Sequence, residues 1–420
     1  MSRNILFLSH RLPYPPNKGD KIRSHALLAH LAARGTVHLG CFVDDRSDLA
    51  HLDTVRQLAG GECHFEFVGP TAKAIRSAGA LVSGKAITVA SFASTRLEAY
   101  LVRLFQKIDF DDVVVFGSAM APYLFNDVFC PQRVLFDMVD VDSDKWRQYS
   151  MASSGFFRWL YAREAATLEE MERSAARLFG KTILVSEFEA DTFRNIAPDY
   201  ADKIGSLTNG VDLDYFASGA FDNPFPQGEC PIVMTGHMDY RPNYEGALWF
   251  AREILPLVRK TIPSARAYFV GASPPPELRA AAGPGVVVTG RVADIRPYLQ
   301  YASAAIAPLR IARGIQNKVL EAMAMARPVV ATREATRALA VRSGTHLWVA
   351  NDPRQFAEAV HTALKGQESE RIARAGHDYV VQHHNWPAVL SQLDTELEKR
   401  RQGQIRAALR NKALFDPQSE

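Results

Sequence analysis

Short runs of apolar, often β-branched residues alternate with longer stretches of helical periodicity in the first half of the chain. Runs of this kind are typical of buried strands in a parallel sheet. The predicted strands are Ile5–Ser9, Val37–Val43, Phe65–Val68, Asp112–Phe116, Val134–Asp137 and Thr182–Ser186. Between the strands, the apolar positions of Asp20–Arg34 and of Phe156–Phe179 recur with helical spacing. The alternation predicts a doubly wound α/β domain.

The same alternation begins again after a segment rich in Gly, Pro, Asn and Asp, residues 198–231, which includes Thr208-Asn209-Gly210-Val211-Asp212. The strands predicted beyond it are Ile232–Thr235, Ala265–Val270, Val286–Thr289, Ala304–Pro308, Pro328–Ala331 and His346–Ala350, with helices at Tyr244–Thr261 and Asn317–Ala326. We expect two Rossmann-like α/β domains with doubly wound parallel sheets. Their predicted bounds are 1–205 and 231–385, with a linker at 206–230 and a C-terminal helix and charged tail at 386–420.

Length and composition agree with this organisation. A chain of 420 residues is too long for one ordinary core. The formal net charge of +3 is spread along the sequence, so no basic arm indicates a nucleic-acid partner. No apolar run approaches the roughly 18 residues that span a bilayer, and the N-terminal run is too short for a signal peptide. The cysteines form no Cys-x-x-Cys pair, which favours a reducing compartment and a cytoplasmic protein, soluble or peripheral at the membrane.

The strongest functional signal is the segment from Pro308 to Ala331, PLRIARGIQNKVLEAMAMARPVVA. A predicted strand ends at Pro308, and a predicted helix starts near Asn317 after a loop with arginine and glycine. The free N–H groups and the dipole of a helix start attract a diphosphate, and Lys318 lies in the first turn. Glu321, one turn further on, is placed to accept hydrogen bonds from sugar hydroxyls. The alternative is a solvated Lys–Glu pair on the helix surface.

This segment resembles the donor-site signature of the GT4 family of retaining GT-B glycosyltransferases, in which a Glu-x7-Glu element precedes Ala-Met-Ala and Pro-Val-Val. The resemblance implies a GT-B fold, with the two domains facing across a cleft, and gives Glu321 the role of binding the donor ribose. Arg313 stands at the position of the first glutamate, so the usual carboxylate contact to the transferred sugar is missing. Gly314, Lys318 and Glu321 instead fit a Gly-x-x-x-Lys-x-Leu-Glu-Ala version of the element.

The resemblance also implies donor contacts at two other strand ends. Gly236 and Arg241 follow the first strand of the second domain, where the family holds the diphosphate, and a guanidinium suits phosphate oxygens. Gly290 and Arg291 follow the third strand, where the family holds the base. A surface arginine and a plain strand-end glycine are the alternatives. The predicted donor-binding residues are Gly236, Arg241, Gly290, Arg291, Arg313, Gly314, Asn317, Lys318 and Glu321.

In the first domain, the loop HRLPYPPNKGDKIR follows the first strand. Prolines stiffen it, and a glycine lets backbone approach a ligand. The resemblance places such a loop near the donor phosphates and the acceptor, with Lys18, Gly19, Asp20 and Arg23 as the predicted contacts. A solvated basic helix start is the alternative for the basic residues.

Four aspartates cluster just past the predicted strand Val134–Asp137. Such carboxylates bind a metal, orient acceptor hydroxyls or accept a proton. We expect Asp140 at the site and helix capping by Asp142 or Ser143. The residues predicted to act in catalysis are Asp140, His10, Lys318 and Glu321. Neither a metal nor a cofactor is expected beyond the nucleotide-diphosphate sugar that serves as co-substrate.

Together, the first-domain loop and the run VDVDSDKW resemble the sugar transferases of bacterial exopolysaccharide clusters that accompany the PEP-CTERM/exosortase system. This implies a glycan or polyprenyl-linked acceptor at the inner face of the membrane, and transfer with retention. The mixed aromatic and arginine run Phe156–Arg163 has the composition of a helix that rests on an anionic bilayer, with core packing of the aromatics as the alternative.

Two other functions fit the same pattern. A GT-B nucleotide-sugar epimerase would also have two Rossmann-like halves, and Arg313 leaves room for a non-catalytic nucleotide-sugar-binding protein. A nicotinamide dehydrogenase is disfavoured, because no Gly-x-Gly-x-x-Gly follows the first strand of either domain.

Overall fold

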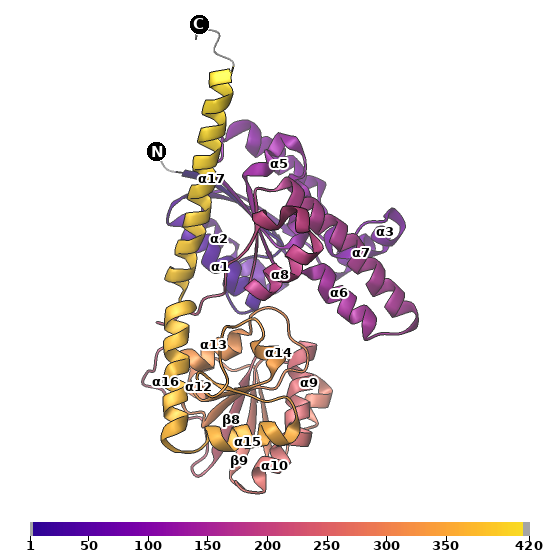
Figure 1. Cartoon of the computed structure of the whole chain (residues 1–420). Coiled ribbons are helices and arrows are strands. Elements are labelled where there is room, and N and C mark those ends of the chain that lie inside the picture. Colours follow the sequence, from indigo (N-terminus) through magenta and orange to yellow (C-terminus); the bar gives the residue numbers. More distant parts are fainter. Residues whose placement is uncertain (1–2, 415–420) are drawn as a thin grey trace. The chain divides into compact units, whose positions relative to one another are not determined.

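The computed structural model describes residues 3–414, with side chains as far as residue 401. The end of the predicted charged tail, residues 415–420, lies outside the described residues. The chain divides into two compact units (Figure 1). Unit 1 comprises Met1–Leu207 and Leu390–Glu420, and unit 2 comprises Thr208–Val389. The chain thus leaves unit 1 at Leu207 and returns to it at Leu390, within its last helix.

Unit 1 is built on a seven-stranded parallel sheet in the order β3-β2-β1-β4-β5-β6-β7. Its strands are β1 (Arg3–Ser9), β2 (Gly35–Val43), β3 (Gly60–Phe67), β4 (Asp112–Phe116), β5 (Val134–Val139), β6 (Lys181–Leu184) and β7 (Ile204–Ser206). Ile5 of β1 pairs with Val37 on one side and with Asp112 on the other. All five residues of β4 are buried, because helices cover both faces of the sheet.

The helices of unit 1 are α1 (Gly19–Ala32), α2 (Leu52–Ala59), α3 (Pro70–Ser83), α4 (Ile87–Ala90), α5 (Thr95–Lys107), α6 (Asp142–Met151), α7 (Gly155–Leu178), α8 (Glu187–Ile196) and most of α17 (Trp386–Leu414). Side chains of α17 anchor it to this unit. Asp394 accepts hydrogen bonds from His30 at 2.9 Å and from Arg34, and Arg401 forms an ion pair with Asp112.

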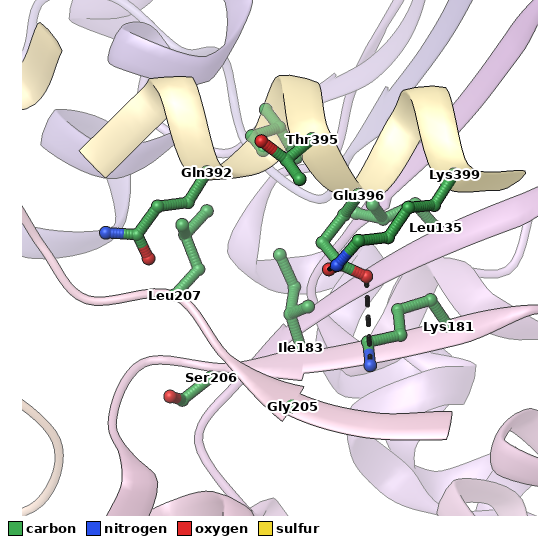
Figure 2. Close-up of a pocket in the computed structure, with 11 residues that line it drawn as sticks. Leu135, Lys181, Ile183, Gly205, Ser206, Leu207, Gln392, Thr395, Glu396 and Lys399 are labelled. Carbon is green, nitrogen blue, oxygen red and sulfur yellow. Dashed lines mark hydrogen bonds and ion pairs between the residues drawn. The ribbon is translucent and has the colours of Figure 1, made fainter. Parts of the chain in front are cut away.

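A small pocket lies between α17 and strands β5 to β7 (Figure 2). Glu396 of α17 faces Lys181 of β6 across it, with 3.8 Å between Oε2 and Nζ, and Lys399 lies 2.9 Å from the same carboxylate. The pocket follows from packing a charged helix onto a sheet face. Glu396 pairs with both lysines, so neither is left without an acidic partner.

Unit 2 is built on a six-stranded parallel sheet in the order β10-β9-β8-β11-β12-β13. Its strands are β8 (Cys230–Thr235), β9 (Ala265–Val270), β10 (Val286–Gly290), β11 (Ala304–Ala307), β12 (Val329–Ala331) and β13 (Trp348–Val349). Its helices are α9 (Arg241–Trp249), α10 (Leu255–Arg259), α11 (Pro276–Arg279), α12 (Arg296–Gln300), α13 (Asn317–Ala324), α14 (Arg333–Thr336), α15 (Pro353–Ala363) and α16 (Gly366–His383). The predicted α/β class with two doubly wound parallel sheets is confirmed. That the two sheets face each other across a cleft stays a prediction.

The structure differs from the prediction at three elements. The helix predicted over Tyr244–Thr261 is interrupted by a π-helical turn at Phe250–Ile254, ahead of Pro256, whose nitrogen cannot donate a hydrogen bond. Strand β3 begins at Gly60, earlier than predicted, because pairing with β2 holds its glycines and polar residues in the sheet. The edge strand β7, only three residues long, was not predicted. Among residues 3–414, no helix is long and apolar enough to cross a membrane.

Candidate functional site

Strands β8 and β11 are neighbours in unit 2, but the chain continues from them in opposite directions along the sheet. The loops after these two strands therefore diverge, and the carboxyl ends of strands at such a switch point are where doubly wound sheets bind ligands. Gly236 follows β8 directly, and the loop after β11 leads into α13 at Asn317.

Lys318 lies against the backbone at the end of β8. A β-carbon added to Gly236, which has a φ of 147°, would come within 3.3 Å of Lys318 Cε and 2.9 Å of Asn243 Nδ2. The buried Asn243 amide in turn donates to the His237 carbonyl at 2.7 Å. Glycine at 236 thus allows the lysine to reach the strand end.

The start of α13 has no side-chain cap from its N-cap residue, Gln316. The Gln316 amide instead donates to the Arg313 carbonyl at 2.8 Å, and its oxygen lies 3.4 Å from Lys318 Nζ. The N-terminal end of this helix therefore keeps its electropositive character, with an ammonium group beside it.

Lys318 and Glu321 are partly buried, and burial disfavours the charge of each. Burial lowers the pKa of Lys318 to about 8, although the Glu321 carboxylate opposes the shift. Burial raises the pKa of Glu321 to about 7, with Lys318 opposing. A partly desolvated ammonium at a helix start is suited to bind an anion, because the anion takes the place of the water that would otherwise solvate the charge.

Sequence reasoning missed Asn209 as part of this site. Its amide Nδ2 donates to Asn317 Oδ1 at 3.2 Å, and its carbonyl oxygen lies 2.9 Å from His384 Nδ1. The segment after Thr208 therefore supports the first residue of α13. The Thr-Asn-Gly run is a visible signal in the sequence, but its composition predicts only a domain junction.

The other predicted donor residues fall into three groups. Gly290 is linked to the site through backbone: its carbonyl accepts from Gly271 N at 3.2 Å, and Gly271 packs against the Gly236 carbonyl. Arg241 is 70% exposed and pairs with Glu245 at 2.7 Å, and Arg291 is exposed on the loop after β10. Gly314 and Arg313 lie in the loop before α13, Gly314 with a φ of 56°.

Unit 1 has its own switch point, between β1 and β4, and His10 occupies it. The His10 ring stacks on Phe116 with 5.7 Å between ring centroids, and a β-carbon on Gly117 would come within 2.4 Å of its Nδ1. Its Nε2 lies 3.6 Å from the carboxylate of Asp20. His10 is therefore held between two strand ends in a fixed orientation.

Asp20 is an ion-pair partner within the protein. Arg11 Nη1 donates to Asp20 at 2.7 Å, and Arg11 Nε donates to Asp44 at 2.8 Å. Burial would raise the pKa of Asp20, but His10 and Arg11 hold it well below its ordinary value. Lys18 and Gly19, just before it, are exposed at the start of α1, so their predicted contact with phosphate stays a prediction.

The prediction for Arg23 needs correction. Its guanidinium is 1% exposed and binds Asp137 through two hydrogen bonds of 2.8 and 3.2 Å. Lys21 is also buried and pairs with Asp48 at 2.7 Å. These charges neutralise buried carboxylates, so Arg23 is not available to a phosphate.

The prediction that Asp142 or Ser143 caps α6 is wrong. Val141 is the N-cap residue, and the buried Glu172 accepts from the Ser143 N–H at 3.0 Å and from its hydroxyl at 2.5 Å. Burial would raise the pKa of Asp142, but Lys145, 2.7 Å away, holds it below its ordinary value. The side chain of Glu172, distant in the sequence, therefore takes the role expected of the local cap.

Asp140 is half-buried and follows a backbone outlier at the end of β5. Val139 has a φ of 71°, a conformation that β-branched residues rarely adopt. Strained backbone of this kind is often found where a side chain must be held in one direction. The structure thus keeps Asp140 as a candidate beside the carboxyl end of the sheet.

The sequence was compared with protein families and with curated proteins. Residues 229–366, which lie within unit 2, match the model of the family described as Glycosyl transferases group 1. No curated protein sequence matches the chain.

Solved structures resemble the chain over nearly its whole length. HepE of Anabaena, solved with UDP-glucose, has a TM-score of 0.67 at 15% identity, covering 94% of this chain and 99% of HepE. Sucrose-phosphate synthase of Thermosynechococcus elongatus has a TM-score of 0.69 at 18% identity, covering 97% and 100%. WaaG, a glycosyltransferase involved in lipopolysaccharide biosynthesis, has a TM-score of 0.64 at 15% identity, covering 93% and 99%. The fold is that of the GT-B glycosyltransferases.

Proposed function

We propose that the chain is a glycosyltransferase that moves a sugar from a nucleotide-diphosphate donor to a hydroxyl of a glycan or polyprenyl-linked saccharide. The observation that carries the proposal is the contact of Lys318 with the strand end at Gly236. This contact sets an ammonium beside an uncapped helix start, at the switch point of a glycosyl transferases group 1 domain. An anionic diphosphate suits that combination.

The donor leaving group gathers negative charge as its bond to the sugar breaks. Lys318 and the N–H groups of α13 would stabilise that charge more than they stabilise the bound substrate, which is how binding becomes catalysis. Removing one such donor typically lowers kcat about 10²- to 10³-fold. Glu321, one turn along, is proposed to accept hydrogen bonds from ribose hydroxyls. No step of this scheme requires a metal.

The acceptor hydroxyl must lose a proton during transfer. In unit 1, the candidates are His10 and Asp140, and the departing phosphate is a third acceptor. Replacing the true general base lowers kcat about 10²- to 10⁴-fold. His10→Gln and Asp140→Asn, compared for kcat with donor binding unchanged, separate the three, because neither variant affects transfer if the phosphate takes the proton.

Retention, an exopolysaccharide acceptor and a location at the inner face of the cytoplasmic membrane are the finer parts of the proposal. Retention follows from the resemblance of the segment Pro308–Ala331 to GT4 donor sites. The first-domain loop and the VDVDSDKW run support a role beside the PEP-CTERM/exosortase system. The similarity to WaaG favours testing lipid-linked acceptors first, and the similarity to HepE favours testing UDP-sugars first.

A thermal-shift panel of nucleotide sugars identifies the donor, because a ligand that binds only the folded state raises its melting temperature. Transfer is then followed with that donor and short polyprenyl-linked saccharides, with and without EDTA. Lys318→Gln and Glu321→Gln are expected to abolish the shift or the transfer, and Lys260→Gln, an exposed lysine of unit 2, is the matched control.

Two other outcomes of these measurements would identify one of the alternative functions. Turnover of the donor sugar without any acceptor would identify an epimerase. Donor binding without turnover, across all acceptors, would identify the non-catalytic binding protein that Arg313 makes plausible. Absence of any nucleotide shift would overturn the proposal as a whole.

A further inference from the structure

An exposed aromatic cluster stands where α6 and α7 join. We call Met151, Phe156, Phe157 and Trp159 the aromatic tip; their side chains are 75%, 63%, 58% and 56% exposed. The rings contact one another instead of the core, with centroid distances of 5.8 Å from Phe156 to Phe157 and 5.7 Å from Phe156 to Trp159. Figure 1 shows the joined ends of α6 and α7 projecting from unit 1.

The rest of α7 is packed in the ordinary way. Leu168 and Ala175 are fully buried against the core of unit 1. Helix α7 has 24 residues and is about 36 Å long, and its buried residues begin only at Glu164. The aromatic first turn therefore extends past the core. This excludes core packing as the role of Phe156, Phe157 and Trp159.

The end of α3 lies beside the aromatic tip. Arg163, one turn beyond Trp159, donates to the carbonyls of Ala80 at 2.8 Å and Lys85 at 3.1 Å. This fixes the segment after Ala80 against α7. Two apolar residues of that segment, Leu81 and Val82, are 39% and 91% exposed. The apolar surface thus spans two elements.

Basic residues flank this apolar surface along the sequence. Residues 70–86 and 151–163 contain five basic residues and no acidic one. Lys73 and Arg76 are neutralised by Asp44 and Glu66. The positive charge that remains belongs to Lys85, Arg158 and Arg163.

We propose that the aromatic tip and the end of α3 form a docking surface for an anionic lipid bilayer. Aromatic side chains, tryptophan above all, favour the level of the lipid headgroups, and flanking basic residues are attracted to anionic lipids. Pairing two copies through this surface would bring like charges together, so a bilayer fits better than a second chain. The inference stands without the proposed transfer reaction, although it would bring the enzyme to a lipid-linked acceptor.

Vesicle co-sedimentation of the full chain tests the proposal. We expect binding to vesicles of phosphatidylglycerol and phosphatidylcholine, and weaker binding to phosphatidylcholine alone. The triple variant Phe156→Ser, Phe157→Ser, Trp159→Ser is expected to weaken binding at least about tenfold, because it removes the apolar area that would enter the bilayer. Val128→Ser is the control, since Val128 is an exposed apolar residue, 66% exposed, outside the surface.

Charge and insertion are tested separately. Arg158→Glu is expected to weaken binding only to the anionic vesicles, and added salt is expected to do the same. All five tryptophans lie within the described residues, and Trp159 alone among them is exposed. Brominated lipids are therefore expected to quench the fluorescence of the wild type, and Trp159→Phe is expected to remove that quenching.

Three results would overturn the proposal: no binding of the wild type to anionic vesicles, equal binding by the triple variant, or a wild-type dimer in solution that the triple variant abolishes. The last would assign the surface to a second copy. Nucleotide binding, measured on the same samples, is expected to be unchanged in the triple variant. Vesicle binding with no nucleotide binding would reject the proposed function and leave the docking surface in place.

Discussion

Lys318 packs against Gly236: a β-carbon at Gly236 would lie 3.3 Å from Lys318 Cε. The two residues are far apart in the sequence, and the neighbouring ends of β8 and β11 bring them together. Their contact decides where the lysine ammonium sits relative to the start of α13. Changes at either residue should therefore affect the same binding step.

Gly236→Ala is expected to weaken binding of a nucleotide diphosphate about tenfold, equivalent to about 1.4 kcal/mol, because the new methyl group displaces Lys318 and Asn243. Isothermal titration calorimetry measures the change. Gly228→Ala is the matched control: Gly228 also has a positive φ, 82°, but a β-carbon there meets open space. Equal losses in the two variants would show that backbone strain alone is responsible.

Nucleotide-diphosphate affinity is expected to depend on pH through Lys318. Burial lowers its pKa to about 8, and phosphate binding requires the charged form. Affinity should fall as the pH rises above about 8, since binding must then also take up a proton. Lys318→Arg, with a guanidinium that stays charged, is expected to remove this dependence between pH 7 and 10. A wild-type affinity that is flat over this range would contradict the role of Lys318.

Arg23 and Asp137 are expected to support stability and not phosphate binding. Arg23→Met leaves a buried carboxylate without its partner and is expected to destabilise unit 1 by about 3–5 kcal/mol. Urea unfolding measures the loss. Adding Asp137→Leu is expected to recover at least half of it, because the unpaired buried charge is then gone. If Arg23→Met folds normally and instead weakens nucleotide binding, the corrected assignment of Arg23 is wrong.

The buried Glu172 is expected to make stability depend on pH. Burial raises its pKa to about 8 from 4.5, so the folded state holds a proton that the unfolded state has released. Between about pH 4.5 and 8, the free energy of unfolding should therefore fall as pH rises. Glu172→Gln mimics the protonated form, and its amide oxygen still accepts from the Ser143 N–H. The variant is expected to match the wild type at pH 5 and to exceed it by about 1–3 kcal/mol at pH 8.5.

The corrections share one physical cause. Arg23 looked like part of a basic loop because its neighbours Lys18 and Lys21 are basic, but its partner Asp137 is 114 residues away. Asp142 looked like a helix cap because short-range rules favour aspartate there, whereas Glu172 reaches the helix start from α7. In both cases a buried group distant in the sequence replaces the local interaction, since a buried polar or charged group needs a partner.

The sequence alone determined the two doubly wound sheets, because runs such as Val113–Val115 are apolar on both faces and can form only buried parallel strands. It also determined the helix start at Asn317 and the lysine in its first turn. Only the tertiary structure decided which charges are available to a ligand, that Asn209 supports Asn317, and that the aromatic start of α7 extends past the core. Strand and helix periods are local properties of the chain, whereas burial and ion pairing depend on which distant segments the fold brings together.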